Sequence, residues 1–295
     1  MDGGLLPPFS AGAHVDLQLA DRLVRSYSLI NSQDERHRYR IAVSKSPSSK
    51  GGSRHMHERL RPGDVIDIGA PRNNFPLHEA AAHSVLIAGG IGITPILGMI
   101  GRLERLGRSW KLYYCARTRR DAAFLETLEA FEAAAPGRVF LNFDHEPGGS
   151  VLDLGSIIAG GGPGTHFYCC GPAAMLEAFR SAASAASVEP ERVHFEYFAP
   201  PEPIVASGGF TVVLARSGLS LPVPPGRSIL EVVLEAGIEV ANSCREGICG
   251  SCETPVLDGI PDHRDYVLSQ REHEANRSMM ICCSGSRSEK LTLDL

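Results

Sequence analysis

The 295 residues are enough for two or three domains, because a single hydrophobic core rarely grows past roughly 250 residues. The composition, 43% hydrophobic and 21% charged, predicts a soluble globular protein, and the absence of any run near ~20 apolar residues excludes a membrane-spanning segment. The net charge of -5 arises in residues 201–295, which argues against nucleic-acid binding and would suit a positively charged protein partner.

The first residues, MDGGLLPPFS, have neither the positive start nor the apolar core of a secretory signal. We therefore expect a cytoplasmic protein.

Residues 1–80 predict a small antiparallel barrel, because short alternating segments are separated by turn residues, as in PPFSAG, NSQDE and RPGD. One helix is expected over residues 53–60, with Ser53 as its N-cap. The strands are expected at residues 14–19, 25–30, 39–43 and 65–68.

Residues 81–198 change to alternating strands and amphipathic helices, which predicts a parallel sheet covered on both faces. Helices are expected after Thr94, over residues 122–133 and after Pro172. The strands are expected at residues 84–88, 110–115, 139–143 and 166–169.

The Pro- and Gly-rich stretch APPEPIVASGG predicts a linker over residues 199–209. The third domain is expected to cover residues 210–295. It begins with a predicted hairpin, residues 210–214 and 219–223, followed by a helix over residues 228–236.

The segment SCREGICGSC carries the strongest chemical signal. Cys244, Cys249 and Cys252 have the spacing C-x4-C-x2-C, which with a fourth distant cysteine is the plant-type [2Fe–2S] pattern. We expect Gly247 and Gly250 to let backbone N–H groups approach the sulfides. A zinc site or a disulfide knot is the alternative, but zinc favours paired C-x2-C knuckles and only one such pair is present.

The fourth ligand is Cys282 or Cys283. Cys282 lies thirty residues after Cys252 and is the preferred ligand by the plant-type spacing.

Two glycine-bearing turns predict a nicotinamide site. AGGIGITP follows an apolar strand and leads into a helix, and CGP does the same further along the chain. Turns at the carboxyl ends of parallel strands face one crevice. A packing role for these glycines, a buried core role for Cys170 and a solvated turn for the arginines after YCA are the simpler alternatives.

The barrel segment RSYSL offers an arginine for a phosphate, a tyrosine for an aromatic face and a serine for a ring nitrogen. KGGS adds glycines and a serine at the start of the predicted helix, where a phosphate could bind. Each pattern is weak alone and would suit an ordinary edge strand or turn.

Taken in order, RSYSL, KGGS, AGGIGITP, YCAR, CGP, EYF and the four cysteines resemble the phthalate dioxygenase reductase and vanillate O-demethylase reductase family over essentially the whole chain. LARSG, PDHRDYVL and LTLDL extend the resemblance. It implies a multidomain fold: an antiparallel β-barrel for flavin, an α/β parallel-sheet domain for NAD and an α+β ferredoxin-like β-grasp domain.

The resemblance also implies FMN in preference to FAD, NADH in preference to NADPH, and site residues by position. The flavin contacts would be Arg25, Ser26, Tyr27, Ser28, Gly51, Gly52, Ser53 and Phe198, and the NADH contacts Gly90, Gly92, Thr94, Pro95, Arg117, Cys170, Gly171 and Pro172. The cluster ligands would be Cys244, Cys249, Cys252 and Cys282. The family usually has one further strand before LPPFSAGAH, so we expect the first barrel strand to be missing and an edge to be exposed.

These cofactors imply an electron-transfer enzyme without a general acid–base pair. Hydride would pass from NADH to the flavin, and single electrons would pass through the cluster to a Rieske-type oxygenase of aromatic compounds. A haem monooxygenase as acceptor is one alternative. A flavin-less iron–sulfur carrier or redox sensor, which would not oxidise NADH, is another.

Overall fold

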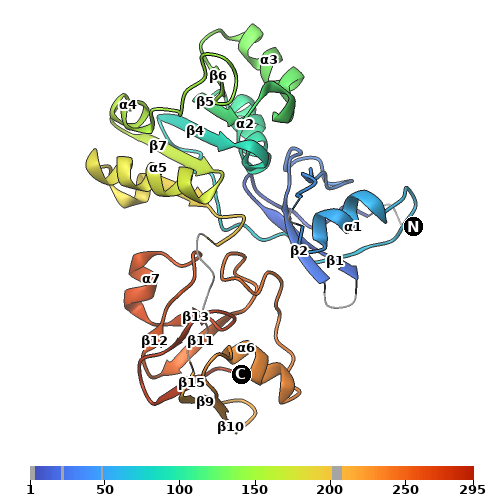
Figure 1. Cartoon of the computed structure of the whole chain (residues 1–295), viewed down its shortest axis with the longest axis vertical. Helices are drawn as coiled ribbons and strands as arrows, with labels where there is room; N and C mark the ends of the chain where they lie inside the picture. The colour runs from blue at the N-terminus through green and yellow to red at the C-terminus, as the bar shows by residue number, and fades with distance from the viewer. Residues whose placement is uncertain (1–3, 21–22, 48, 201–207) are drawn as a thin grey trace. The chain divides into compact units, whose positions relative to one another are not determined.

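The computed structural model describes residues 4–20, 23–47, 49–200 and 208–295. The chain divides into two compact units, Met1–Phe198 and Ala199–Leu295 (Figure 1). Each unit has its own hydrophobic core.

The N-terminal unit begins with an antiparallel sheet of order β2-β1-β3. Its strands are β1 (His14–Ala20), β2 (Leu23–Ser28) and β3 (Asp67–Ile68). Alternate residues of β1, Val15, Leu17 and Leu19, are buried in a small core, as the period of two requires.

The predicted strand at residues 39–43 is wrong, because this segment forms no regular ladder within the described residues. Ile30 N donates to Arg40 O at 2.9 Å, but Arg40 N donates to the Asn31 side-chain oxygen instead of to a backbone carbonyl. A side-chain acceptor therefore replaces the next backbone hydrogen bond that a strand pair would make. Tyr39 and Ile41 still pack against the small core, so the segment keeps the expected apolar role.

The helix α1 (Gly52–Glu58) follows as expected, but its predicted N-cap, Ser53, is wrong. The N-cap is Gly51, whose φ of 98° favours glycine. The hydroxyl of Ser49 accepts from Arg54 N in the first turn at 3.2 Å, while that of Ser53 accepts from Ser46 N. A serine two residues before the N-cap thus satisfies one of the free N–H groups.

The second part of this unit confirms the parallel sheet, in the order β6-β5-β4-β7-β8. The central strand SVLIA is buried on both faces, and α2 buries Ile93, Ile96, Ile100 and Leu103 at helical spacing. The strands are β4 (His83–Gly89), β5 (Ser109–Ala116), β6 (Val139–Phe143), β7 (Thr165–Cys170) and β8 (Val193–Glu196). The helices are η1 (Gly90–Gly92), α2 (Ile93–Arg105), η2 (Arg119–Asp121), α3 (Leu125–Ala134), α4 (Leu154–Ala159), α5 (Ala173–Ala185) and η3 (Pro190–Arg192).

The strand order reverses between β4 and β7, because the chain adds β5 on one side of β4 and β8 on the other side of β7. Right-handed connections running in opposite directions place α2 and α5 on opposite faces of the sheet. In such sheets the ligand crevice lies outside the carboxyl ends of the strands at this reversal.

The C-terminal unit holds a five-stranded sheet of order β10-β9-β15-β11-β13, in which β9 and β15 are parallel. The predicted hairpin matches β9 and β10, and Ser228 caps α6 in a capping box with Glu231. The elements are β9 (Phe210–Leu214), β10 (Leu219–Val223), α6 (Ile229–Glu235), β11 (Glu253–Asp258), β12 (Pro261–Asp262), α7 (Gln270–Ala275), β13 (Ser278–Met280), β14 (Gly285–Ser286) and β15 (Lys290–Leu293).

The part of the chain that the structure describes contains no helix that is both long and apolar enough to cross a bilayer.

Candidate cofactor sites

The C-terminal unit brings together the cysteines that the spacing singles out. Three of them lie in the loop between α6 and β11, and Cys282 and Cys283 follow β13. Backbone N–H groups point at two of the sulfurs, with Glu246 N 3.2 Å from Cys244 Sγ and Cys244 N 3.5 Å from Cys249 Sγ. Such donors stabilise thiolates that carry a metal. Cys244 beside it and burial raise the pKa of the Cys249 thiol.

The structure separates the roles of the two adjacent cysteines. The Cys282 thiol interacts with the thiols of both Cys244 and Cys283, and the Cys283 thiol also donates to Met280 O at 3.6 Å. A Cβ on Gly247, whose φ is +66°, would lie 2.6 Å from Cys283 Sγ. Cys283 therefore packs beneath the loop, and the contacts favour Cys282 as the fourth ligand, which stays a prediction.

The turns after β4 and β7 are pressed against each other. A Cβ on Gly92 would lie 2.1 Å from Cys170 O, and one on Gly171 would lie 3.1 Å from Gly89 N. Gly90, with a φ of +54°, faces open space instead, since nothing lies within 4 Å of its Cβ position. Only glycine allows these two turns to meet while the backbone stays open at the start of α2.

Three of the residues expected in this crevice are buried. The Cys170 side chain is part of the hydrophobic core, and burial raises the pKa of its thiol far above the usual range. Thr94 is buried too, and its hydroxyl donates to Ile91 O at 3.0 Å. Pro95 is buried next to it. These contacts show Cys170 and Thr94 shaping the turns, and any contact of the three with NADH stays a prediction.

Glu196 is a candidate site residue that the sequence interpretation missed, although EYF contains it. It ends β8 in register with Cys170 of β7. Its Oε2 is buried and has no hydrogen-bond partner among the described residues, and burial raises the pKa of the carboxyl to about 8. A buried carboxyl without a partner beside the ligand crevice marks it as a candidate contact for the nicotinamide or the flavin.

We expect Glu196→Gln to flatten the pH dependence of stability in the absence of cofactors. The folded-state pKa is raised, so between the ordinary value of 4.5 and about 8 the folded protein holds a proton that the unfolded chain has lost. The free energy of unfolding attributable to this group therefore falls as the pH rises through that window. Urea unfolding at pH 6 and pH 8.5 should show the fall in the cofactor-free wild type and a smaller one in Glu196→Gln; equal pH dependence in both would contradict the assignment.

Asp144 is a second orphaned carboxylate at the same sheet edge, just after β6. Its Oδ1 is buried without a hydrogen-bond partner among the described residues, and its N–H donates to Ala116 O at 3.3 Å. Of the nearby arginines, Arg119 is held in an ion pair with Glu129, while Arg117 is exposed. A carboxylate oxygen without a partner suits ribose hydroxyls better than a phosphate.

The predicted flavin segment places Arg25 over the turn before α1. Its guanidinium donates to Lys50 O at 3.0 Å, and a Cβ on Gly52 would lie 2.7 Å from Arg25 Cγ. Ser26 is engaged elsewhere, since its hydroxyl donates to Asp16 Oδ1 at 2.6 Å. The bare glycine turn beneath an arginine fits a phosphate group. The remaining flavin contacts lie as follows: Tyr27 half-buried, Ser28 buried, Gly51 and Ser53 at the start of α1, and Phe198 exposed at the end of the unit.

Two domain families match the chain. Residues 86–181 match the oxidoreductase NAD-binding domain, and residues 212–285 match the 2Fe-2S iron-sulfur cluster binding domain. Among solved structures, phthalate dioxygenase reductase aligns with a TM-score of 0.71 at 39% identity over 99% of this chain and 90% of that one. An intact type IV self-sufficient cytochrome P450 monooxygenase aligns with a TM-score of 0.89 at 36% identity, over 100% of this chain and 38% of that one.

The similarity to characterised relatives extends over nearly their whole length. Phenoxybenzoate dioxygenase subunit beta of Ectopseudomonas oleovorans is 52% identical, over 98% of this chain and 89% of the relative. Tetrachlorobenzoquinone reductase of Sphingobium chlorophenolicum is 50% identical over 99% and 90%, and vanillate O-demethylase oxidoreductase of a Pseudomonas strain is 43% identical over 100% and 92%. The chain therefore belongs to the phthalate dioxygenase reductase and vanillate O-demethylase oxidoreductase family.

Proposed function

We propose that this chain is the NADH-dependent reductase component of a Rieske-type oxygenase or O-demethylase system acting on an aromatic compound. The observation that carries the proposal is the presence, in one chain, of a nicotinamide-type crevice and a loop of cysteines suited to a one-electron cluster. When bound, FMN exchanges a hydride for single electrons and the [2Fe–2S] cluster carries them one at a time.

The residues fit these groups in different ways. The turns at Gly90–Gly92 and Gly171 leave backbone free at the carboxyl edge of the sheet, where they would hold the pyrophosphate of NADH. Arg25 over the Gly52 turn would hold the FMN phosphate, and the cysteine loop with Cys282 would hold the irons. The protein's own contribution is to bind and orient; no proton donor is needed for hydride transfer.

The eight cysteines are all unbridged, which supports a reducing compartment and hence our assignment of the protein to the cytoplasm.

We expect NADH to be preferred over NADPH, because the Asp144 carboxylate oxygen, unpartnered among the described residues, would accept from ribose hydroxyls and repel a 2′-phosphate. Replacing Asp144 with Asn should raise the KM for NADH about tenfold and narrow the preference, since a charged hydrogen bond contributes about 1.5–3 kcal/mol. Steady-state rates of ferricyanide reduction, measured with NADH and with NADPH for the wild type and Asp144→Asn, give both the KM values and the preference between the two nucleotides. A wild type that prefers NADPH would contradict the assignment and implicate the exposed Arg117.

An anaerobic titration tests the proposed function. The flavin of the purified full-length protein is extracted and identified, and NADH is then added while the visible spectrum and the electron paramagnetic resonance signal are recorded. Bleaching of flavin bands together with a reduced-cluster signal would support the reductase. A cluster spectrum without flavin, unmoved by NADH, would support the flavin-less carrier instead.

Two other acceptors each have a specific observation in their favour. A small quinone is suggested by the relative named tetrachlorobenzoquinone reductase, and a haem monooxygenase by the match of this whole chain to 38% of a self-sufficient cytochrome P450 chain. A small quinone can accept electrons directly from a flavin, so its reduction should survive loss of the cluster. Reduction of a haem protein or a Rieske oxygenase should depend on the cluster. Rates with and without the cluster therefore separate a quinone from the two protein acceptors, and the rates with each purified protein separate those two.

A further inference from the structure

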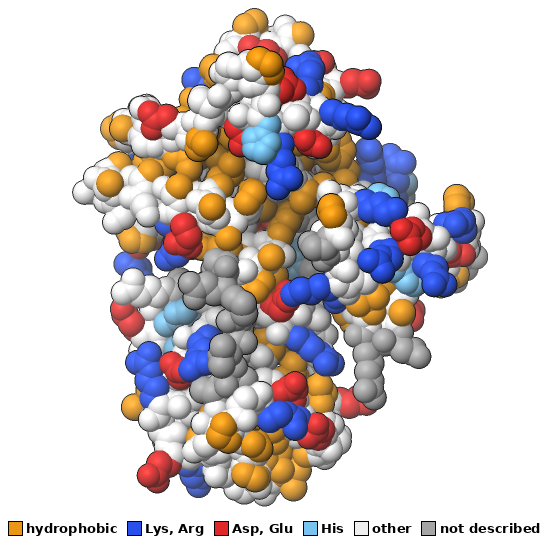
Figure 2. Space-filling model, viewed as in Figure 1, with side chains coloured by type: hydrophobic (Ala, Val, Ile, Leu, Met, Phe, Trp, Pro, Cys, Tyr) orange, Lys and Arg blue, Asp and Glu red, His pale blue; other side chains and the backbone are white. Residues whose placement is uncertain are grey.

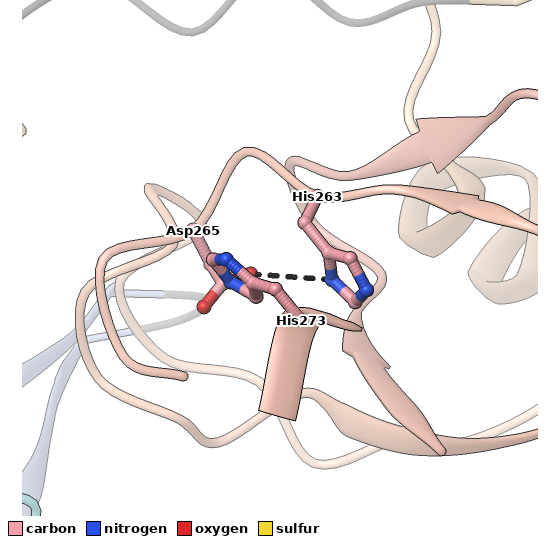
Figure 3. A group of neighbouring side chains, drawn as sticks. All are labelled: His263, Asp265 and His273. Carbon is pink, nitrogen blue, oxygen red and sulfur yellow. Dashed lines mark hydrogen bonds and ion pairs between the residues drawn. The ribbon is translucent and has the colours of Figure 1, made fainter. Parts of the chain in front are cut away.

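A second group of possible metal ligands lies in the C-terminal unit, outside the cysteine loop (Figure 3). His263 and Asp265 follow β12, and His273 lies on α7. One nitrogen or oxygen atom of each lies within 4.8 Å of the others. Two imidazoles and a carboxylate are a ligand set that zinc and similar divalent transition metals accept.

The carboxylate of Asp265 is oriented by the backbone. Its side chain is fully buried, and its Oδ2 accepts from Val267 N at 3.1 Å and Leu268 N at 2.8 Å. This leaves Oδ1 facing the two histidines, 3.1 Å from His273 Nε2 and 3.8 Å from His263 Nδ1. Oδ2 is thus held by the backbone, while Oδ1 is shared between the two histidines.

His263 has the least satisfied atom of the group. Its Nε2 is 3.1 Å from Asn276 Oδ1, and because an amide oxygen can only accept, Nε2 carries the proton and Nδ1 presents a lone pair. That Nδ1 is buried, in a side chain only 8% exposed, and has no hydrogen-bond partner among the described residues. A buried lone pair therefore faces a carboxylate oxygen with no donor between them, an arrangement that a bound cation would satisfy.

We propose that His263 Nδ1, Asp265 Oδ1 and His273 Nε2 bind a divalent transition metal of the zinc class. Asn276 then acts as the outer acceptor that fixes the tautomer of His263, as such partners do in metal sites. The two rings are stacked at 4.4 Å, so His273 must turn its ring toward the metal; its side chain is 29% exposed.

The charges around this site are compatible with a cation. Two arginines of this region, Arg264 and Arg287, both pair with Asp262, at 2.7 Å and 3.5 Å.

The proposed metal site is hydrogen bonded to the cysteine loop. Metal binding there is separate from the electron transfer proposed above. Tyr266 N donates to Gly247 O at 2.9 Å, and Arg264 N donates to Ser284 Oγ at 3.2 Å. The segment that holds the metal ligands is therefore hydrogen bonded both to the loop and to the turn after Cys283.

Calorimetric titration of Zn²⁺ into the chelator-treated full-length protein, with its cluster in place, tests the proposal. We expect one tight site per chain, weakened about 10- to 100-fold in His273→Ala. His37→Ala is the matched control, because His37 is a 69% exposed histidine in the N-terminal unit, and its affinity should equal that of the wild type. Equal affinity in the wild type and His273→Ala would overturn the proposal.

Zinc X-ray absorption of the loaded wild type gives an answer that needs no variant. We expect nitrogen and oxygen ligands with the scattering pattern of imidazole. A sulfur-dominated shell would place the zinc on the cysteines and overturn the proposal, including in the case where His273→Ala fails to fold.

Discussion

Replacing Cys282 with alanine is expected to abolish the iron–sulfur cluster, while replacing Cys283 with alanine should leave it intact. The thiol of Cys282 interacts with that of Cys244, whereas the thiol of Cys283 donates to Met280 O and lies beneath Gly247. A [2Fe–2S] cluster needs four ligands, and alanine supplies none. Iron and acid-labile sulfide should fall about tenfold or more in Cys282→Ala and stay near two of each per chain in Cys283→Ala.

The two variants are matched, because they remove the same atom from adjacent buried residues, 8% and 1% exposed. General damage to folding would therefore affect both, and Cys283→Ala more. Loss of the cluster in Cys283→Ala alone would make Cys283 the ligand. An intact cluster in both would show that the fourth ligand is a different group.

Loss of the cluster should also separate the two halves of the electron path. The nicotinamide crevice belongs to the N-terminal unit and the cysteine loop to the C-terminal one. In Cys282→Ala we expect NADH to reduce the flavin at the wild-type rate, while electron delivery to a protein acceptor stops. Stopped-flow spectra at the flavin bands, followed by an acceptor assay, measure both steps.

The sequence predicted those parts of the fold whose hydrophobic pattern lies within one continuous segment of the chain. The parallel sheet follows from SVLIA and the periodic apolar residues of α2, and the hairpin of β9 and β10 from its alternating pattern, since both patterns reflect burial of one face or two. The strand expected at residues 39–43 has the same alternation. It fails because Asn31 takes the place of a ladder partner, and a side-chain acceptor leaves no trace in hydrophobic periodicity.

The site shows the same limit. The cysteine spacing and the glycine turns were visible because each motif lies in one stretch of the chain. Glu196 and Asp144 were missed as orphaned carboxylates because burial without a partner arises only when β6 pairs with β5 and β8 pairs with β7 in the folded sheet. Cys170 shows the opposite case, in which a local motif suggested a role for a side chain. The motif CGP after a strand predicted a nicotinamide contact, but the Cys170 side chain lies in the core.

Replacing Gly92 with alanine is expected to slow the reduction of the flavin by NADH about 100-fold, since a displacement near 1 Å at a reacting centre can cost that much. Gly92 has a helical φ of -60°, so alanine is not strained by its backbone. The cost is steric: the new Cβ would lie 2.1 Å from Cys170 O and 2.5 Å from Cys170 C, and both are backbone atoms that cannot rotate away. The turns after β4 and β7 must therefore move apart, and the crevice between them must change shape.

Gly101→Ala is the matched control, because Gly101 lies in α2, the helix that Gly92 precedes, with nothing within 4 Å of its Cβ position. Alanine there should raise helix stability by roughly 1 kcal/mol and leave the rate of NADH oxidation unchanged. Both variants should keep their cluster, since the cysteine loop belongs to the other unit. A wild-type reduction rate in Gly92→Ala, with the cluster and flavin present, would mean that NADH does not approach through these turns, and the nicotinamide site would then have to lie elsewhere on the carboxyl edge of the sheet.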